Sequence, residues 1–589
     1  MERGRNIHAY PFTRVIQEAG ILGVMSSYND YDGFPIQSSY YWLTQRLRGT
    51  MGFRGYVVSD SDAVEYLYSK HKTAKDMKEA VRQSVEAGLN VRCTFRSPES
   101  YVLPLRELIQ EGGLSMETID NRVRDILRVK FLTGLFDTPY QTNLALADKE
   151  VNSKAHQQVA LQASREGLVL LKNANNLLPL DKSQIKRIAV CGPNADEASF
   201  ALTHYGPVAV EVTTVLEGIK QQVKEGTKVT YTKGCDLVDA NWPESEIISY
   251  PLTAEEKTEI QKAVDNVKES DVAVVVLGGG IRTCGENKSR TSLDLPGHQQ
   301  QLLEAIVATG KPVVLVLING RPLSINWADK FVPAILEAWY PGSQGGTAIA
   351  EALFGNYNPG GKLTVTFPKT VGQIPFNFPA KPASQVDGGQ TPGMKGNQSR
   401  INGPLYPFGY GLSYTTFEYS NLQLSSPVIT DKEPVTVTCK IKNTGTRSGD
   451  EVVQLYTRDV VSSVTTYEKN LRGFERVHLE PGETKEVSFQ LLPRDFQLLN
   501  KDNHWVVEPG MFQIMIGASS EDIRLKKGLE IRAYGQASTN EIIESDPRDF
   551  ISASKNKSHI IHVVDGDYST TWKGEKGEYI SFELAENAR

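Results

Sequence analysis

An aspartate at the end of a short apolar segment is the first residue of this sequence that suggests chemistry. The segment GFRGYVVSD (residues 52–60) reads as a buried strand that ends on Ser59 and Asp60. In a parallel barrel the carboxyl end of a strand is where catalytic groups lie, so the Asp60 carboxylate would face a substrate pocket. Asp is also a favoured N-cap, and Asp60 could instead cap the helix that follows. The segment alone leaves both interpretations open.

The elements around Asp60 alternate between apolar runs and amphipathic helical patterns. This alternation is typical of parallel βαβ units, and the first 145 residues contain three such runs, which are too few to close a barrel. Asp62 is expected to cap a helix rather than to act in catalysis. The expected strands lie at residues 21–28, 55–60 and 89–95, and the expected helices at 38–51, 73–87, 100–110 and 116–135.

The rest of the chain predicts two further folds. Residues 155–415 continue the alternation of strand and helix, as in a layered α/β sandwich, and a Gly- and Pro-rich stretch at 377–407 predicts a long loop. From 416 to 532 the apolar period changes to two, which indicates an all-β sandwich of about seven strands. Residues 537–589 begin another β-rich unit and stop in the middle of its pattern.

The amino-acid composition limits the kinds of molecule that the protein is expected to bind. The 64 Lys and Arg residues against 70 Asp and Glu give a net charge of -6, which argues against a nucleic-acid or anionic-membrane partner and favours an uncharged substrate. No apolar run reaches the roughly 18 residues of a membrane span. The five cysteines are scattered without CxxC spacing, so we expect neither a metal site nor a disulfide framework, and no cofactor.

Several motifs, in one order along the chain, resemble glycoside hydrolase family 3. GFRGYVVSDSDAV is similar to the nucleophile motif of that family, with Asp60 at the position of the attacking aspartate. GVMSSYNDYDGFP resembles the strand beside the first sugar subsite, which implies substrate-binding roles for Tyr28 and Met25, although Met25 could also be plain core. Further matching segments are LVLLKNANNLLPL (168–180), IAVCGPNAD (188–196), YPGSQGGTAIAEALFGNYNPGGKLTVTFP (340–368) and PFGYGLSYTTF (407–417).

The resemblance also implies a general acid/base on a loop of the second domain. GGGIRTCGENKSRTSLDLPGHQ resembles the form of that loop in which a Glu lies four residues before an Arg and ten before a Pro, a spacing that Glu286, Arg290 and Pro296 satisfy. The family form often has an Asp immediately before the Arg, where this chain has Ser289. The alternative is that Glu286 is an ordinary solvated loop acid.

Together these features predict a multi-domain α/β protein. We expect the C-terminal part of a TIM-type (β/α) barrel at residues 1–145 and an α/β sandwich that carries the acid/base loop at 155–415. A sandwich that resembles fibronectin type III domains is expected at 416–532, and a partial discoidin-like or galactose-binding-like jelly roll at 537–589. Family members begin well over a hundred residues earlier, so the first barrel strands are expected to be missing.

The function that the resemblance implies is that of a retaining, exo-acting β-glycosidase, a β-glucosidase first and a β-xylosidase second. Asp60 would form a covalent glycosyl-enzyme while Glu286 donates and later withdraws a proton, with the two carboxyl groups about 5 to 5.5 Å apart. The substrate would be an oligosaccharide or a plant-glycan-derived β-glycoside, hydrolysed in the periplasm or outside the cell. The alternative hypothesis is an inactive fragment or a non-catalytic carbohydrate-binding remnant. The sequence predicts no oligomeric state.

Overall fold

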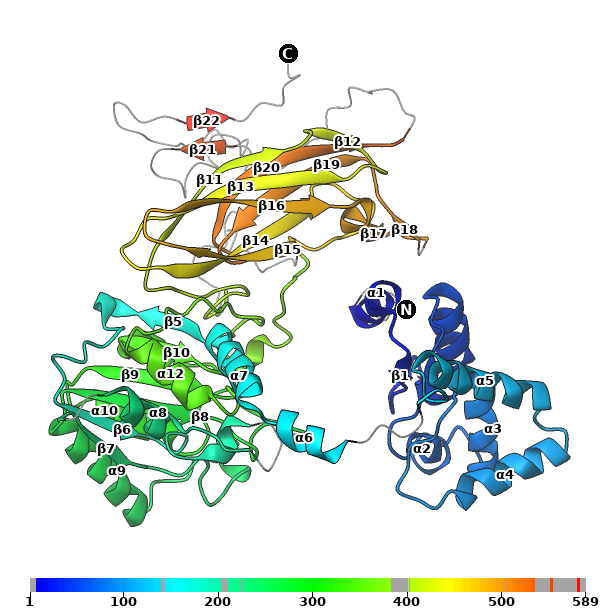
Figure 1. Cartoon of the computed structure of the whole chain (residues 1–589), viewed down its shortest axis with the longest axis horizontal. Helices are drawn as coiled ribbons and strands as arrows, with labels where there is room; N and C mark the ends of the chain where they lie inside the picture. The colour runs from blue at the N-terminus through cyan, green and yellow to red at the C-terminus, as the bar shows by residue number, and fades with distance from the viewer. Residues whose placement is uncertain are drawn as a thin grey trace, which may run out of the picture. The chain divides into compact units, whose positions relative to one another are not determined.

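The protein is described by a computed structural model, which covers residues 7–138, 143–202, 210–223, 226–382, 401, 403–502, 504–534, 551–553 and 580–582. The chain divides into two compact units, Met1–Lys149 and Glu150–Arg589. The second unit contains an α/β domain and a β sandwich, whose elements can be followed in Figure 1. None of the helices among the described residues is long and apolar enough to cross a membrane.

The first unit is built on short parallel strands. β1 (Gly23–Met25) pairs in parallel with β4 (Tyr56–Val58), and Val58 makes one parallel bridge to Val91 on the segment expected as a third strand. The predicted barrel portion is therefore confirmed as a parallel arrangement, although the third run contributes a single bridge instead of a full strand. The remaining elements are α1 (Ala9–Arg14), η2 (Val15–Ala19), β2 (Asp30–Tyr31), β3 (Phe34–Pro35), η3 (Ile36–Ser38), η4 (Tyr41–Thr50), α2 (Ala63–Ser69), α3 (Met77–Ala87), α4 (Glu99–Gln110) and α5 (Met116–Leu132).

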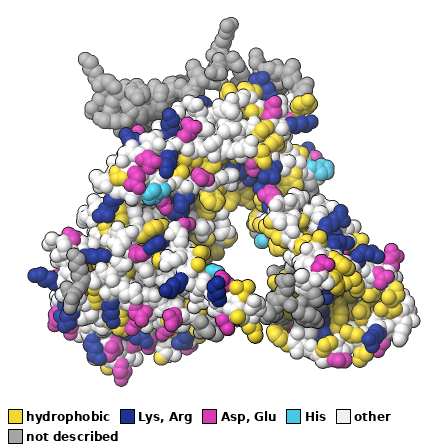
Figure 2. Space-filling model, viewed as in Figure 1, with side chains coloured by type: hydrophobic (Ala, Val, Ile, Leu, Met, Phe, Trp, Pro, Cys, Tyr) yellow, Lys and Arg dark blue, Asp and Glu magenta, His cyan; other side chains and the backbone are white. Residues whose placement is uncertain are grey.

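The helices of the first unit begin at residues that satisfy their free N–H groups. Asp76 caps α3 by accepting a hydrogen bond from Glu79 N, and Ser115 caps α5 by accepting one from Thr118 N. α3 buries one apolar face, whereas α5 buries none of its residues. Hydrophobic side chains accordingly gather on the surface of this unit in the space-filling view (Figure 2). Those of α5 include Met116, Val123, Leu127 and Phe131.

The α/β domain is organised around one mixed sheet with the strand order β5-β10-β9-β8-β6-β7. Five of these strands are parallel, and β5 pairs antiparallel with β10 at the edge, a strand that the sequence reasoning did not predict. The strands are β5 (Val169–Asn173), β6 (Arg187–Cys191), β7 (Lys228–Thr232), β8 (Val272–Gly278), β9 (Val313–Ile318) and β10 (Ala334–Glu337).

Both faces of this sheet are covered by helices. Every residue of β8 and β9 is buried, which explains why these strands read as continuous apolar runs. Alternate residues of β8 enter two cores, one shared with α9 and α10 and the other with α7, α8 and α12. The helices, with the short helix α6 before them, are α6 (Leu144–Glu150), α7 (Lys154–Gly167), α8 (Val215–Gln222), α9 (Ala254–Lys268), α10 (Gln299–Val307), α11 (Asn326–Phe331) and α12 (Gly345–Leu353).

The β sandwich follows the predicted period of two. Residues Val435, Val437, Cys439 and Ile441 of β13 point into its core and alternate with more exposed neighbours. The described strands form sheets of three (β11-β13-β16) and five (β12-β20-β19-β14-β15), one strand more than expected because short β12 pairs with β20. The strands are β11 (Phe417–Leu424), β12 (Val428–Thr430), β13 (Val435–Asn443), β14 (Gly449–Asp459), β15 (Asn470–Leu479), β16 (Thr484–Leu491), β19 (Gly510–Gly517) and β20 (Ile523–Arg532).

The sandwich is tied to the α/β domain through polar contacts. Lys362 and Glu451 form an ion pair of 2.9 Å in which both side chains are nearly buried, and Gln454 Nε2 donates to Gly409 O at 3.0 Å. After the sandwich, β21 (Ile551–Ala553) pairs antiparallel with β22 (Ile580–Phe582). Most of the expected jelly roll at 537–589 lies outside the described residues.

Candidate active site

Asp60 follows β4 at the carboxyl end of the parallel strands. The preceding residue is fixed by two hydrogen bonds to the third run: Ser59 N donates to Val91 O at 2.8 Å, and Cys93 N donates to Ser59 Oγ at 2.8 Å. Asp60 itself is half-buried, and its Oδ1 accepts from Ser61 N at 2.7 Å. The carboxylate is therefore carried on a backbone that is bonded to the neighbouring segment at Val91 and Cys93.

The capping interpretation finds no support in the structure. α2 begins at Ala63, and no side chain caps it. The contact between Asp60 and this helix start is made by its backbone carbonyl, which accepts a hydrogen bond from Ala63 N. Asp62 occupies the N-cap position in a left-handed conformation with φ 58°, but its carboxylate accepts from Thr94 Oγ1. Asp62 is therefore at the cap position, as predicted, but its carboxylate makes no bond to the helix, because Thr94, 32 residues further along the chain, supplies a hydroxyl donor.

The two predicted substrate-binding residues lie at the same edge as Asp60. Met25 ends β1 in register with Val58, and its exposed fraction of 59% shows that it is not a core residue. Tyr28 lies three residues further along, with its ring centroid 5.2 Å from that of Tyr66 on α2. The structure thus brings Met25 and Tyr28 to the strand ends where Asp60 lies, while their contacts with a sugar stay a prediction.

A buried ion pair supports this edge, and the sequence reasoning missed it. Arg92 Nε donates to Glu65 Oε1 at 3.0 Å, and the two side chains are only 4% and 1% exposed. The Arg92 guanidinium also lies 5.5 Å from the ring centroid of Tyr101, whose pKa burial raises to about 12. The signal in the sequence was a lone Glu between the apolar Val64 and Leu67 on the buried side of α2.

Glu286 stands at the tip of a turn that follows β8. Lys288 N donates to Gly285 O at 3.1 Å, and Asn287 is left-handed with φ 60°. Together these features describe a hydrogen-bonded β-turn with Glu286 in its second position and a left-handed residue in its third. Its side chain is exposed.

The strand order explains why a loop at this position suits a ligand. β6 lies between β7 and β8, so the connections from β6 and β8 leave in opposite directions, and such a switch point at the carboxyl ends of parallel strands is where open α/β sheets bind ligands. Asn194, just after β6, donates to Gly279 O at 2.9 Å and Ile318 O at 3.1 Å. The carboxyl ends of three neighbouring strands, β6, β8 and β9, are thereby joined where the segment that leads to Glu286 begins.

Arg290, on the same loop, pairs with a carboxylate from another segment, since the residue before it is Ser289 and not an Asp. Glu246 forms a buried ion pair with Arg290, the side chains being 5% and 3% exposed, and also accepts from Thr291 N at 2.8 Å. The Arg290 guanidinium lies 5.1 Å from the Trp242 ring centroid. The loop is therefore supported by the segment between β7 and α9, which no local spacing indicated.

The candidate residues thus form two groups, one in each unit. Asp60, Met25 and Tyr28 belong to the first unit, and Glu286 with its supports belongs to the second. The carboxyl separation of 5 to 5.5 Å that retention requires stays a prediction.

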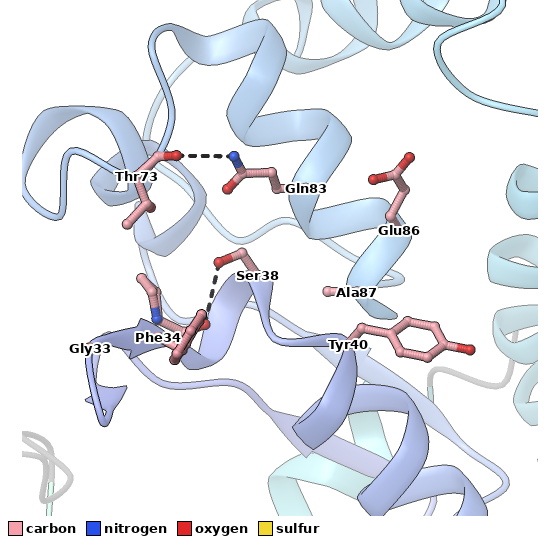
Figure 3. A pocket seen from close by; sticks show the side chains of 9 residues that line it. Gly33, Phe34, Ser38, Tyr40, Thr73, Gln83, Glu86 and Ala87 are labelled. Carbon is pink, nitrogen blue, oxygen red and sulfur yellow. Dashed lines mark hydrogen bonds between the residues drawn. The ribbon is translucent and has the colours of Figure 1, made fainter.

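A cavity of about 370 Å³ lies elsewhere in the first unit (Figure 3). It is lined by residues of β3 and α3 and by the residue just before η4, including Phe34, Glu86 and Tyr40. Gln83, which also lines it, donates to Thr73 O at 3.1 Å. None of the predicted site residues lines this cavity, so we do not assign the substrate to it.

One carboxyl group of the α/β domain is completely buried. Glu337 ends β10 with 0% exposure, its Oε1 accepts from Trp339 N at 2.8 Å, and Asn319 lies within hydrogen-bonding reach. Burial raises the pKa of Glu337 from 4.5 to about 8. The folded protein therefore keeps this group neutral at pH 7.

We expect Glu337→Gln to remove a pH-dependent loss of stability. Between pH 4.5 and about 8 the unfolded chain releases the Glu337 proton while the folded chain retains it, so the free energy of unfolding falls by about 1.4 kcal/mol for each pH unit. Below this window both states are protonated, and above it both are ionised. Urea titrations at about pH 5.5 and 7.5 should show the variant gaining stability over the parent as pH rises.

The matched control is Glu304→Gln on α10, where the glutamate is exposed. It should leave the pH dependence of stability as it is in the parent. An unchanged pH dependence in Glu337→Gln as well would contradict a neutral, buried carboxyl group.

Family models match most of the chain. A model described as the glycosyl hydrolase family 3 N terminal domain matches residues 1–129, and one described as the glycosyl hydrolase family 3 C-terminal domain matches residues 168–414. A fibronectin type III-like domain model matches residues 451–520.

Individual proteins and solved structures match between 87% and 89% of this chain. A beta-xylosidase of Formosa agariphila is 39% identical over 89% of this chain and 71% of its own length. A periplasmic beta-glucosidase of Salmonella typhimurium is 38% identical over 87% of this chain and 68% of its own. Among solved structures, a β-glucosidase from Erythrobacter marinus matches with a TM-score of 0.80 and 37% identity, over 89% of this chain and 69% of that one. A Listeria innocua beta-glucosidase solved with glucose matches with a TM-score of 0.79 and 34% identity, over the same shares.

Proposed function

The chain belongs to glycosyl hydrolase family 3, and from this premise we propose that it is a retaining, exo-acting β-glycosidase. The observation that carries the proposal is the placement of Asp60. It follows the parallel strand β4, whose middle residue Val57 is buried, at the carboxyl end of the strands and within the motif that resembles the family nucleophile. Met25 and Tyr28, at the same edge, are proposed to contact the sugar bound there.

The proposed reaction is a double displacement that uses two carboxyl groups. The ionised Asp60 attacks the anomeric carbon and forms a glycosyl ester, while the protonated Glu286 gives its proton to the departing aglycone oxygen. Glu286, now ionised, takes a proton from water, and the resulting nucleophile attacks the anomeric carbon and releases Asp60. Two inversions return the anomeric centre to its original configuration.

The substrate we propose is a β-linked oligosaccharide, with glucose first and xylose second as the sugar released from the non-reducing end. The relatives support this class: they include a protein named beta-xylosidase and others named beta-glucosidase, one of which was solved with glucose. The matches to both family domains also favour an enzyme over a non-catalytic remnant.

The anomeric configuration of the released sugar tests this proposal. We expect the protein to hydrolyse p-nitrophenyl β-glucoside faster than the β-xyloside, and proton NMR at early times should detect the β anomer of the sugar before mutarotation produces the α anomer. The same experiment on the corresponding α-glucoside is the control and should show no turnover. An α anomer released first would contradict the double displacement, and no turnover of either β-glycoside would contradict the function.

We propose a periplasmic location, which the name of the Salmonella typhimurium relative supports. Fractionation of the native cells followed by immunoblotting would test it, and recovery of the protein with the cytosolic markers would refute it.

A further inference from the structure

The proposed acid/base residue stands on a turn that needs support from outside. Glu286 is exposed at the tip of Gly285–Lys288, and a single backbone hydrogen bond, from Lys288 N to Gly285 O, closes that turn. A general acid must be held in place, because a misplacement of about 1 Å can cost roughly 100-fold in rate.

Arg321 makes two hydrogen bonds that flank the turn. Its Nη2 donates to Thr283 O at 3.0 Å and to Lys288 O at 2.8 Å. One NH₂ group thus uses its two hydrogens to join a carbonyl three residues before Glu286 to a carbonyl two residues after it. The guanidinium is well suited to this bridge because it is planar, permanently charged and presents its donors in a fixed geometry.

The backbone that carries Arg321 is itself fixed against the loop. Asn319, just after β9, donates through its backbone N to Trp339 O at 3.1 Å and through Nδ2 to Arg321 O at 2.7 Å. A Cβ atom on Gly320 would lie 2.5 Å from both Cys284 Sγ and Tyr340 Cε2, so a larger residue here would force one of these side chains to move. Arg321 therefore begins from a turn packed directly on the loop residue Cys284.

The loop has a second support at its C-terminal end, at Arg290. Arg290 is held by the buried Glu246, so the segment from Thr283 to Arg290 is anchored through Arg321 near its start and its centre and through Glu246 at its end. Glu286 lies between these anchors. Arg321 is the nearer of the two, since its acceptors are on the turn and immediately before it.

We propose that Arg321 is a positioning residue for acid/base catalysis, which bridges Thr283 O and Lys288 O and so fixes the turn that presents the Glu286 carboxyl group. The proposal rests on the proposed role of Glu286. It assigns Arg321 no contact with substrate, and it predicts that losing the bridge impairs proton transfer to the leaving group more than binding or nucleophilic attack.

The test compares leaving groups in the full chain. Arg321→Met should lower kcat/KM by about 10- to 100-fold for phenyl β-glucoside, whose leaving group needs a proton, and by less than about threefold for dinitrophenyl β-glucoside, whose leaving group does not. Arg321→Lys should recover part of the loss, because an ammonium group can donate to both carbonyls. The control is Arg187→Met, which removes an arginine that pairs with Glu269. Arg187 is the first residue of β6 and so lies at the amino ends of the parallel strands, whereas the Glu286 loop follows the carboxyl end of β8.

Amide hydrogen exchange supplies a readout that does not depend on turnover. Arg321→Met should accelerate exchange in the peptide that covers residues 279–292, and Arg187→Met should not. Unchanged exchange there would overturn the bridge. If Arg321→Met fails to fold, Arg321→Lys carries the test, and an equal loss of kcat/KM with both leaving groups refutes the proposal.

Glu286→Gln measured in parallel separates the two possible failures. If Glu286→Gln shows the dependence on leaving group and Arg321→Met does not, the positioning role is wrong and the proposed function stands. If Glu286→Gln itself shows no such dependence, the proposed role of Glu286 is wrong, and the positioning role falls with it.

Discussion

Asp60→Asn is expected to lower kcat/KM for aryl β-glycosides by about 1000-fold or more, with both good and poor leaving groups. An amide cannot form the glycosyl ester, so the first displacement loses its nucleophile, and losses of this size are typical when a covalent catalyst is removed. The fold should survive, because the asparagine oxygen can still accept from Ser61 N as Asp60 Oδ1 does. Steady-state rates with p-nitrophenyl β-glucoside measure the effect, and thermal melting reports on the fold.

Asp62→Asn is the matched control for this variant. Asp62 lies two residues further on, carries the same charge and accepts from Thr94 Oγ1. Its substitution should cost far less activity than that of Asp60. A fluorinated glucoside with a dinitrophenyl leaving group should also trap the ester, and mass spectrometry should locate the sugar on the peptide that contains Asp60. A rate within a few fold of the parent, or a label on another peptide, would refute Asp60 as nucleophile.

The strands that could be predicted from sequence are those whose burial is decided locally. β8 and β9 are covered on both faces, so every side chain is apolar and the run is visible without knowledge of its neighbours. The sandwich strand β13 is equally clear, because each core residue alternates with a more exposed one. Asp60 was found from the motif around it and from its place just after the short apolar segment of β4, of which only Val57 is buried.

The elements that could not be predicted depend on partners far away in the chain. β5 joins the sheet antiparallel at its edge, and only its pairing with β10, more than 150 residues later, distinguishes it from a loop. Glu246 supports Arg290 across 44 residues, and Arg321 reaches back 33 residues to Lys288. Such contacts leave no periodic signal. The supports of the Glu286 loop are therefore visible only in the folded chain.

Asp62 shows how a local rule can be overridden. Its place just before α2 is that of an N-cap, and a free peptide would use the carboxylate to satisfy the first turn of the helix. In the protein, the segment after Val91 passes close by and supplies the Thr94 hydroxyl, while Asp62 adopts a left-handed conformation. A tertiary hydrogen bond thus replaces the local one at the edge that carries the proposed nucleophile.

Glu286→Gln is expected to lower kcat/KM for phenyl β-glucoside by about 100- to 10000-fold while changing that for dinitrophenyl β-glucoside little. The amide cannot donate a proton to the leaving oxygen, which costs this much where the leaving group is poor and almost nothing where it is already stable as an anion. With the dinitrophenyl substrate, release of the sugar from Asp60 becomes slow, because no base activates water. Added azide needs no base, so it should restore kcat and yield the β-glycosyl azide.

Glu304→Gln on α10 is the matched control for Glu286→Gln, since both glutamates are exposed and lie in the same domain. It should change neither the dependence on leaving group nor the response to azide. The azide product is the decisive part of the comparison, because its β configuration requires attack on a covalent intermediate from the face that the aglycone left. A Glu286→Gln enzyme that treats both leaving groups alike would show that another residue supplies the proton. An α-glycosyl azide would show direct displacement without a covalent intermediate and would contradict the acid/base role of Glu286.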